Sequence, residues 1–146
     1  MVWHADLEPL GHNDILAVGW LEPGREYNRG PVAPTFAAAF CDLVADPWQP
    51  FACAGFHSCG FCRLSGGSHF FQLGNRSVQV GTSNLYVPAA SKVFFCPSLM
   101  IHYADAHEYA PPEEFIRAVL ECPPMRSKEY LKAIKPFAQR LQDVHP

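Results

Sequence analysis

The stretch HFFQLGNRSVQVGTSNLYVPAASKVFFC, residues 69–96, decides the fold class of this chain. It contains four short runs rich in aromatic and β-branched residues, and Gly, Asn, Ser and Pro separate them. The runs span residues 69–73, 76–81, 85–87 and 92–96. Links as short as these join antiparallel neighbours, because a parallel crossover needs about a dozen residues or more. The stretch therefore predicts an antiparallel meander.

Two further apolar runs and one helical pattern precede the meander. Residues 15–20 and 51–56 are apolar runs beside turn residues, which is typical of buried strands. Between them Phe36, Phe40 and Val44 recur at the spacing of one helix face, after a Pro-Thr start and before an Asp-Pro stop. The sequence thus predicts two strands and one amphipathic helix before residue 69.

From Pro97 onward the pattern becomes helical. One predicted helix begins at Pro97, a second at residues 111–114, where two prolines precede two glutamates, and a third at the N-cap residue Ser127. An interior proline costs a helix about 3 kcal/mol, so a kink or break is expected at Pro136. Strands followed by helices predict an α+β fold, in which an antiparallel sheet of about five strands has helices packed on one side. We expect residues 1–146 to form a single domain.

The composition narrows the classes of protein to consider. Lys and Arg total 11 against 14 Asp and Glu, so the net charge of −3 offers no basic field and nucleic acid is not an expected partner. No apolar run approaches the roughly 20 residues of a membrane span, and the first residues lack a secretion leader. We therefore expect a cytoplasmic protein without membrane contact. In that reducing compartment, six cysteines favour metal binding or redox chemistry over disulfides.

The run GFHSCGFC, residues 55–62, contains the most informative pair of cysteines. Cys59 and Cys62 have the C-x-x-C spacing with which one tight turn supplies two thiolates to a tetrahedral metal ion. His102 and His107 have four residues between them, which lies inside the H-x3-5-H spacing of zinc sites. The sequence therefore predicts a Cys2His2 zinc site that joins the end of a strand to a helix.

The spacing of the two histidines sets a geometric condition on this site. At about 100° per residue, His102 and His107 diverge by roughly 140° around a regular helix and would not reach the same ion. A tightened or unwound last turn removes the conflict, and the prolines at residues 111–112 place a helix end nearby. If the helix stays regular, His57 is the substitute ligand, because on an extended chain it shares a face with Cys59.

The remaining cysteines and histidines have simpler interpretations. Free cysteine usually packs as a small apolar residue, so we assign the cysteines outside the C-x-x-C pair to the core. Histidines near the termini, or at the opening of a strand, are expected at the surface. The predicted core cysteines are Cys41, Cys53, Cys96 and Cys122, and the predicted surface histidines are His4, His12, His69 and His145.

Several segments together resemble an uncharacterised bacterial domain family of unknown function. Two motifs carry the resemblance: G-[FY]-H-x-C-x-x-C at residues 55–62 and H-Y-x-x-x-H-x-Y-x-P-P-x-E-F at residues 102–115. The resemblance implies a self-contained domain and places His57 in one constellation with the two cysteines and two histidines, but it implies no reaction. This chain departs from the family pattern by two extra cysteines, Cys53 and Cys96.

Two alternative functions would use the same cysteines. A thioredoxin-type redox protein needs a helix that begins at the second cysteine, but residues 63–68 contain two adjacent glycines and no apolar period. A zinc-dependent hydrolase needs an open coordination position, and the H-x-E and H-E-x-x-H signatures are absent from the sequence. The sequence favours a zinc-binding domain that acts as an interaction module for an unidentified protein partner. Trp3, Trp48 and Tyr109 are the hypothetical contact residues.

Overall fold

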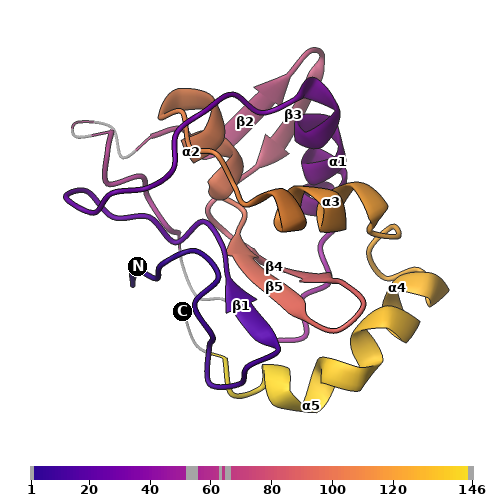
Figure 1. The fold of residues 1–146 in the computed structure, drawn as a ribbon. Coiled ribbons are helices and arrows are strands. Elements are labelled where there is room, and N and C mark those ends of the chain that lie inside the picture. Colours follow the sequence, from indigo (N-terminus) through magenta and orange to yellow (C-terminus); the bar gives the residue numbers. More distant parts are fainter. Residues whose placement is uncertain (1, 52–55, 63, 65–66, 145–146) are drawn as a thin grey trace.

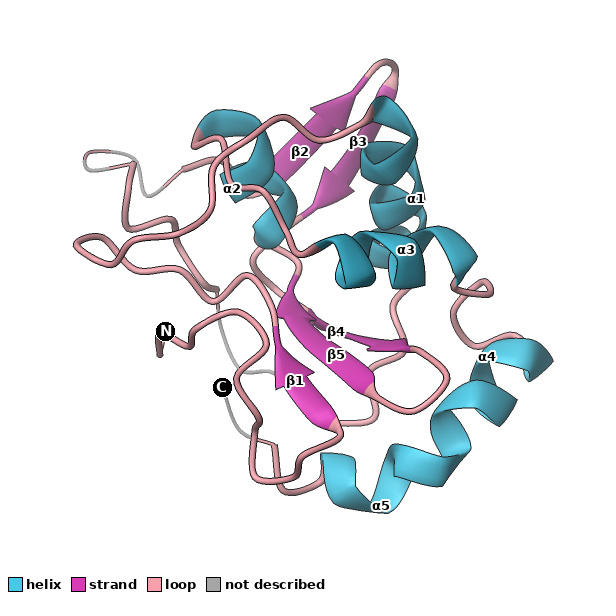
Figure 2. Cartoon of the chain, in the orientation of Figure 1, coloured by secondary structure: helices cyan, strands magenta, loops and turns pink. Residues whose placement is uncertain are grey.

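The computed structural model describes residues 2–51, 56–62, 64 and 67–144, and it confirms the predicted α+β class (Figures 1 and 2). No described helix is long and apolar enough to cross a membrane. The strands are β1 (Ile15–Ala17), β2 (Phe70–Leu73), β3 (Arg76–Gln79), β4 (Asn84–Pro88) and β5 (Val93–Pro97). The helices are α1 (Pro34–Ala45), α2 (Met100–Ala106), α3 (Glu113–Glu121), α4 (Lys128–Ile134) and α5 (Ala138–Leu141), with a 3-10 turn η1 (Lys135–Phe137).

The five strands divide between two sheets, where the sequence predicted one. The order of the larger sheet is β1-β5-β4, and β2 pairs with β3 in a separate hairpin. The meander stops at Gly81, because neighbouring residues occupy the backbone groups that would continue it. The Gly81 carbonyl accepts a hydrogen bond from the His57 N–H at 2.7 Å, and the Gly81 N–H donates to the Ser98 hydroxyl at 2.9 Å.

One strand pair is parallel, which the short links did not predict. β1 runs parallel to β5, with Ile15 opposite Val93. β1 is also shorter than the predicted strand at residues 15–20, since Gly19 adopts a φ of +79° and turns the chain. Of the predicted strand at residues 51–56, positions 52–55 lie outside the described residues, and Phe51 and Phe56 belong to no strand.

β4 and β5 are buried along their whole length. Phe94 packs edge-on against Phe115 of α3, with ring centroids 5.6 Å apart, whereas Phe95 stacks on Trp20 at 5.1 Å. Successive residues of a strand point to opposite faces. Helix α3 therefore covers one face of the larger sheet, and Trp20 from the loop after β1 covers the other.

The helices follow the sequence pattern, except that the helix predicted from Pro97 begins at Met100, because strand β5 extends through Pro97. α1 begins at Pro34 and packs against α3 and β3, beside the β2-β3 hairpin in Figure 1. Ser127 caps α4 as predicted, because its hydroxyl accepts a hydrogen bond from the Tyr130 N–H at 3.2 Å. The predicted break at Pro136 is confirmed: α4 ends before it, η1 contains it and α5 continues the chain.

Candidate metal centre

The two cysteines of the C-x-x-C pair lie on one tight turn. The Cys62 N–H donates to the Cys59 carbonyl at 3.3 Å, which closes the turn. The backbone N–H groups of Phe61 and Cys62 also donate to the Cys59 sulfur. Such donors stabilise a thiolate, which is the form that binds a metal. The turn therefore presents one buried sulfur, on Cys59, and one half-buried sulfur, on Cys62.

The two histidines meet because helix α2 ends between them. His102 lies within α2, whereas His107 is its C-cap residue, with a φ of −125°. The next residue, Glu108, has a φ of +59°, and the Tyr109 N–H returns to the Tyr103 carbonyl at 3.1 Å. Because the last turn is unwound, the His107 ring points in a different direction from the one it would have on a regular helix. The helix end thus meets the geometric condition that the five-residue spacing imposed.

Four ligand atoms converge on one point between the turn and α2. The atoms offered by Cys59, Cys62, His102 and His107 all lie within 4.8 Å of one another. The Cys59 Sγ lies 3.4 Å from the His107 Nε2, and the Cys62 Sγ lies 3.4 Å from the His102 Nε2 and 3.5 Å from the His107 Nε2. Zinc–sulfur bonds of about 2.3 Å and zinc–nitrogen bonds of about 2.0–2.1 Å, at tetrahedral angles, separate sulfur from nitrogen by about 3.6 Å. The three sulfur–nitrogen distances given are close to this value, so the group could hold a metal ion.

The electrostatic surroundings favour the uncharged form of both imidazoles. Burial lowers the pKa of His102 below its ordinary value of 6.5, and the nearby His107 lowers it further, while Asp105 acts in the opposite direction. Burial also lowers the pKa of His107, with Arg29 as the second cause. Burial raises the pKa of the Cys59 thiol, and the N–H groups of the turn oppose that shift. Neutral imidazole is the form that binds a metal, so both rings are ready to act as ligands.

A loop far away in the sequence braces the second histidine. The Tyr27 hydroxyl donates to the His107 carbonyl at 2.9 Å, and the Arg29 Nη1 donates to the same oxygen at 3.3 Å. The Phe61 ring packs on the His107 ring, with centroids 5.0 Å apart, and on the Tyr27 ring at 5.7 Å. These contacts fix the orientation of His107, much as outer-shell partners orient metal ligands.

The backbone of Gly67 closes the site on another side. A Cβ atom at this position would lie 3.1 Å from the Cys59 Cβ and 3.3 Å from the His102 Nε2. The φ of Gly67 is +82°, in the region that favours glycine. The two adjacent glycines at residues 66–67 were the one signal in the sequence for a close approach of the backbone here. Nothing in the sequence pointed to Tyr27 or Arg29.

The structure brings together the four predicted ligands and places the substitute outside them. His57 is not in the group of four, and its ring packs edge-on against Trp20 at 6.5 Å. The other described cysteines are Cys41 and Cys96, which are buried as predicted, and Cys122, which is half-buried. His69 is exposed as predicted, whereas His4 and His12 are half-buried and contact Glu8 and Asp143. Cys53 and His145 lie outside the described residues.

Of the hypothetical contact residues Trp3, Trp48 and Tyr109, the structure excludes Tyr109 from the surface. Tyr109 is fully buried, and its hydroxyl donates to both oxygens of Asp6, at 2.9 and 2.8 Å. Trp48 is half-buried and packs against Tyr86 and Tyr130. Trp3 is half-buried under a guanidinium group. Aromatic residues near loops often fill the core, and sequence alone does not separate the two roles.

Comparison with known proteins identifies a family without assigning a reaction. The model of a family described as a domain of unknown function (DUF7919) matches residues 3–120, which include all four side chains of the site. This match agrees with the resemblance to an uncharacterised domain family. Comparisons with curated proteins and with solved structures found no match.

Proposed function

Because the chain belongs to the DUF7919 family of domains of unknown function, we propose its role from the site itself: a domain whose structural zinc ion supports an interaction surface. The observation that carries this proposal is the convergence of two sulfurs and two imidazole nitrogens within 4.8 Å. Cys59, Cys62, His102 and His107 would hold the ion. The zinc would tie the turn that follows the undescribed residues 52–55 to the end of helix α2.

The donor set favours zinc over other abundant divalent metals. Calcium and magnesium prefer oxygen ligands, whereas thiolate and imidazole together suit zinc. The sulfur–nitrogen separations of 3.4–3.5 Å match a tetrahedral arrangement, which is the usual geometry of zinc in such sites. Hence zinc is the ion that both the chemistry and the dimensions select.

The number of protein donors favours a structural role. Catalytic zinc sites usually have three protein ligands and keep the fourth position for water or substrate. Here four side chains converge, and the half-buried Cys62, His102 and His107 enclose the buried Cys59. A hydrolase would need one of these four to leave the ion. The geometry thus favours a closed shell over the hydrolase alternative.

The redox alternative lacks the helix that it needs. A thioredoxin-type pair has its cysteines at a helix N-terminus, where the dipole lowers the thiol pKa. In the described residues after Cys62, the next regular element is strand β2, which begins at Phe70. Burial raises the pKa of Cys59 instead. A pair that also faces two imidazole nitrogens therefore fits metal binding better than dithiol exchange.

Exposed apolar side chains beside the turn support a role in interaction. Phe56, Leu64 and Phe70 are 59%, 103% and 58% exposed, and all three come from the segment that surrounds the cysteine pair. The Phe56 ring lies against the His69 ring, with centroids 4.7 Å apart. Exposed apolar side chains in one segment can mark a contact with another protein. A zinc ion beneath the segment would hold this surface in one arrangement.

Metal analysis of three proteins tests the zinc assignment. Wild-type protein, purified without chelator or affinity-tag metal, should contain about one zinc per chain by mass spectrometry, as one four-ligand site requires. The Cys59→Ser variant should lose the metal. The matched control Cys122→Ser should keep it, since the Cys122 thiol donates to the Pro123 carbonyl at 3.3 Å and is not in the group of four. Equal metal content in the two variants would contradict the assignment of Cys59 as a zinc ligand.

Cobalt substitution tests the closed shell separately. Cobalt(II) bound by thiolates in a tetrahedral site gives intense visible absorption, and five- or six-coordinate cobalt absorbs far more weakly. A closed Cys2His2 shell should give a spectrum that does not change when small anions are added. A spectrum that shifts on addition of azide or thiocyanate would show an open position and favour the hydrolase alternative.

A further inference from the structure

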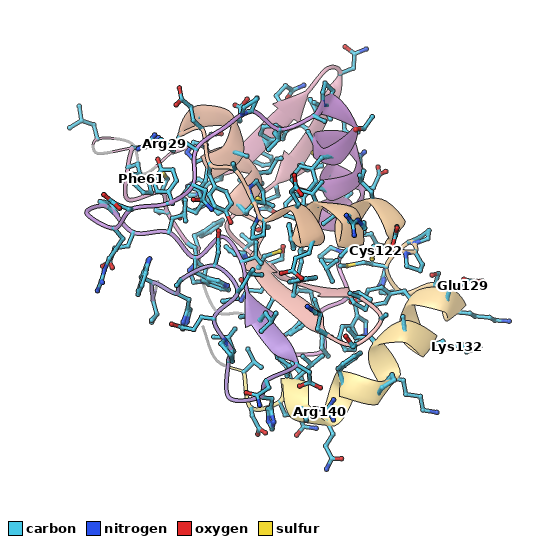
Figure 3. The ribbon with its side chains drawn as sticks, viewed as in Figure 1. Arg29, Phe61, Cys122, Glu129, Lys132 and Arg140 are labelled. Carbon is cyan, nitrogen blue, oxygen red and sulfur yellow. The ribbon has the colours of Figure 1, made fainter. Side chains whose placement is uncertain are left out.

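A surface pocket of about 450 Å³ lies beside the metal centre. Phe61 lines the pocket and also packs against the His107 ring, so the pocket and a predicted ligand share one neighbour. Figure 3 shows Phe61 and Arg29 next to each other on this side of the molecule. The residues that line the pocket are Gly24, Arg25, Glu26, Tyr27, Arg29 and Phe61.

Two arginines of the pocket are held in place by aromatic rings. The Arg25 guanidinium carbon lies 4.3 Å from the centroid of the Trp3 ring, and that of Arg29 lies 4.5 Å from the centroid of the Tyr27 ring. A guanidinium group stacked on a ring keeps its N–H donors at its edge, free to meet a ligand. The stacking also restricts the side chain before binding, which reduces the entropy lost when a ligand is held.

These two arginines also lack the close carboxylate partners that others in this chain have. Arg76 and Arg140 lie 2.5 Å from Asp42 and Asp14, and Arg126 contacts Asp46. Arg25, by contrast, approaches Glu22 only to 3.8 Å. Within the described part of the chain, no carboxylate oxygen lies within 4.0 Å of Arg29, whose Nη1 donates to the His107 carbonyl instead. Most donors of both guanidinium groups therefore remain available.

We propose that this pocket is a binding site for a small organic anion, whose carboxylate or phosphate group meets the guanidinium edge of Arg29 and whose apolar body lies on Phe61, while Arg25 adds a second positive charge. The planar guanidinium fork matches the geometry of both kinds of anion. The pocket volume of about 450 Å³ is within the range of small-molecule sites. Glu26 also lines the pocket, so two positive groups act against one negative group. The ligand is thus expected to be a compact anion of low charge.

Titration with simple probes tests this proposal. Phenyl phosphate, benzoate and neutral benzyl alcohol are added separately to the wild-type protein at constant ionic strength. Nuclear magnetic resonance follows the backbone amides of residues 24–29 and 61. We expect saturable shifts with at least one of the two anions and none with benzyl alcohol. The anion that binds more tightly, phosphate or carboxylate, identifies the ligand group.

Four charge variants make the test specific. Arg29→Gln should weaken anion binding about tenfold or more, because it removes hydrogen bonds to a charged group, and Arg25→Gln should weaken it less, because it removes only a nearby positive charge. Glu26→Gln should strengthen it, since it removes the opposing carboxylate. Arg117→Gln is the matched control: it removes one exposed positive charge from α3, and Arg117 lines a different pocket. Its effect on binding should be less than about twofold, as expected for a distant, screened charge.

Three outcomes would overturn the anion site. One is the absence of saturable shifts with either anion at millimolar concentration, and another is binding of benzyl alcohol as tight as that of the anions. The third is an equal loss of binding in Arg29→Gln and Arg117→Gln, which would indicate general attraction by charge. Zinc content is measured in every sample, because Arg29 also contacts His107. Loss of anion binding in a variant that still contains zinc supports the anion site. If the anion site is overturned, the zinc assignment is unaffected.

Discussion

Gly67→Ala is the substitution that most directly tests how the backbone encloses the metal centre. The φ of Gly67 is +82°, and alanine in this region costs about 1–2 kcal/mol. The new Cβ would also lie 3.1 Å from the Cys59 Cβ and 3.3 Å from the His102 Nε2, which is closer than carbon atoms normally approach. Relief of these contacts displaces two of the four ligand side chains by a few tenths of an ångström.

The displacement should appear mainly in the affinity for zinc. Metal–ligand distances tolerate shifts of about 0.2 Å, and changes in the residues that surround a metal site typically cost about 10–100-fold in affinity. We therefore expect Gly67→Ala to bind zinc about 10–100-fold more weakly, a loss of about 1.4–2.7 kcal/mol. The metal-free variant should lose only the backbone term of about 1–2 kcal/mol. Competition with a chromophoric chelator measures the first quantity, and urea unfolding of the metal-free protein measures the second.

Gly11→Ala separates the two effects. Gly11 has a nearly identical φ of +80°, but a Cβ at this position would meet nothing within 4 Å. It should therefore carry the same backbone cost and leave zinc affinity unchanged. If Gly67→Ala and Gly11→Ala bind zinc equally well, the backbone of Gly67 does not confine the ligands and the reasoning is refuted.

Acidification should destabilise the domain, because burial lowers the pKa of His102 and His107 below 6.5 and the unfolded chain then binds more protons. Stability to urea should thus fall as the pH drops from 7 through 6.5 toward the pKa values of the two histidines in the folded protein. The fall should be steeper with zinc bound, because protons compete with the metal. A stability that does not change with pH would contradict the assignment of His102 and His107 as buried ligands. The apolar surface is tested by immobilising the domain and identifying any protein that it retains. A double variant with Phe56→Ser and Phe70→Ser should keep its zinc but no longer retain that protein. The controls Leu120→Ser and Leu131→Ser, at residues 49% and 43% exposed, should still retain it. Retention of the same protein by all variants would exclude this surface as the contact.

Local sequence signals predicted the helices well, but they did not predict which distant strands pair with each other. The spacing of Phe36, Phe40 and Val44 located α1, and Pro136 located the break before α5, because each depends on neighbours in the chain. The parallel pairing of Ile15 with Val93 depends on residues far apart in sequence, for which neither segment carries a local signal. Likewise, the end of the meander depends on the hydrogen bonds that Gly81 makes with His57 and Ser98.

The same distinction applies to the metal centre. The C-x-x-C pair and the histidine spacing predicted which four side chains would meet, since ligand spacing is a local property. The bracing of the His107 carbonyl by Tyr27 and Arg29 came from another part of the chain. A tyrosine and an arginine in a loop do not indicate that they hold a metal ligand in place, because many loops contain both residues. Sequence patterns thus identify ligands more readily than the residues that orient them.

The helices after residue 120 make the folding unit longer than the segment that defines the family. The family match ends at residue 120, yet Tyr130 of α4 donates to the Tyr86 carbonyl of β4 at 2.6 Å, and its ring covers Trp48. Farther on, Arg140 of α5 pairs with Asp14, just before β1. A fragment cut at the family boundary would therefore leave part of the larger sheet open to water.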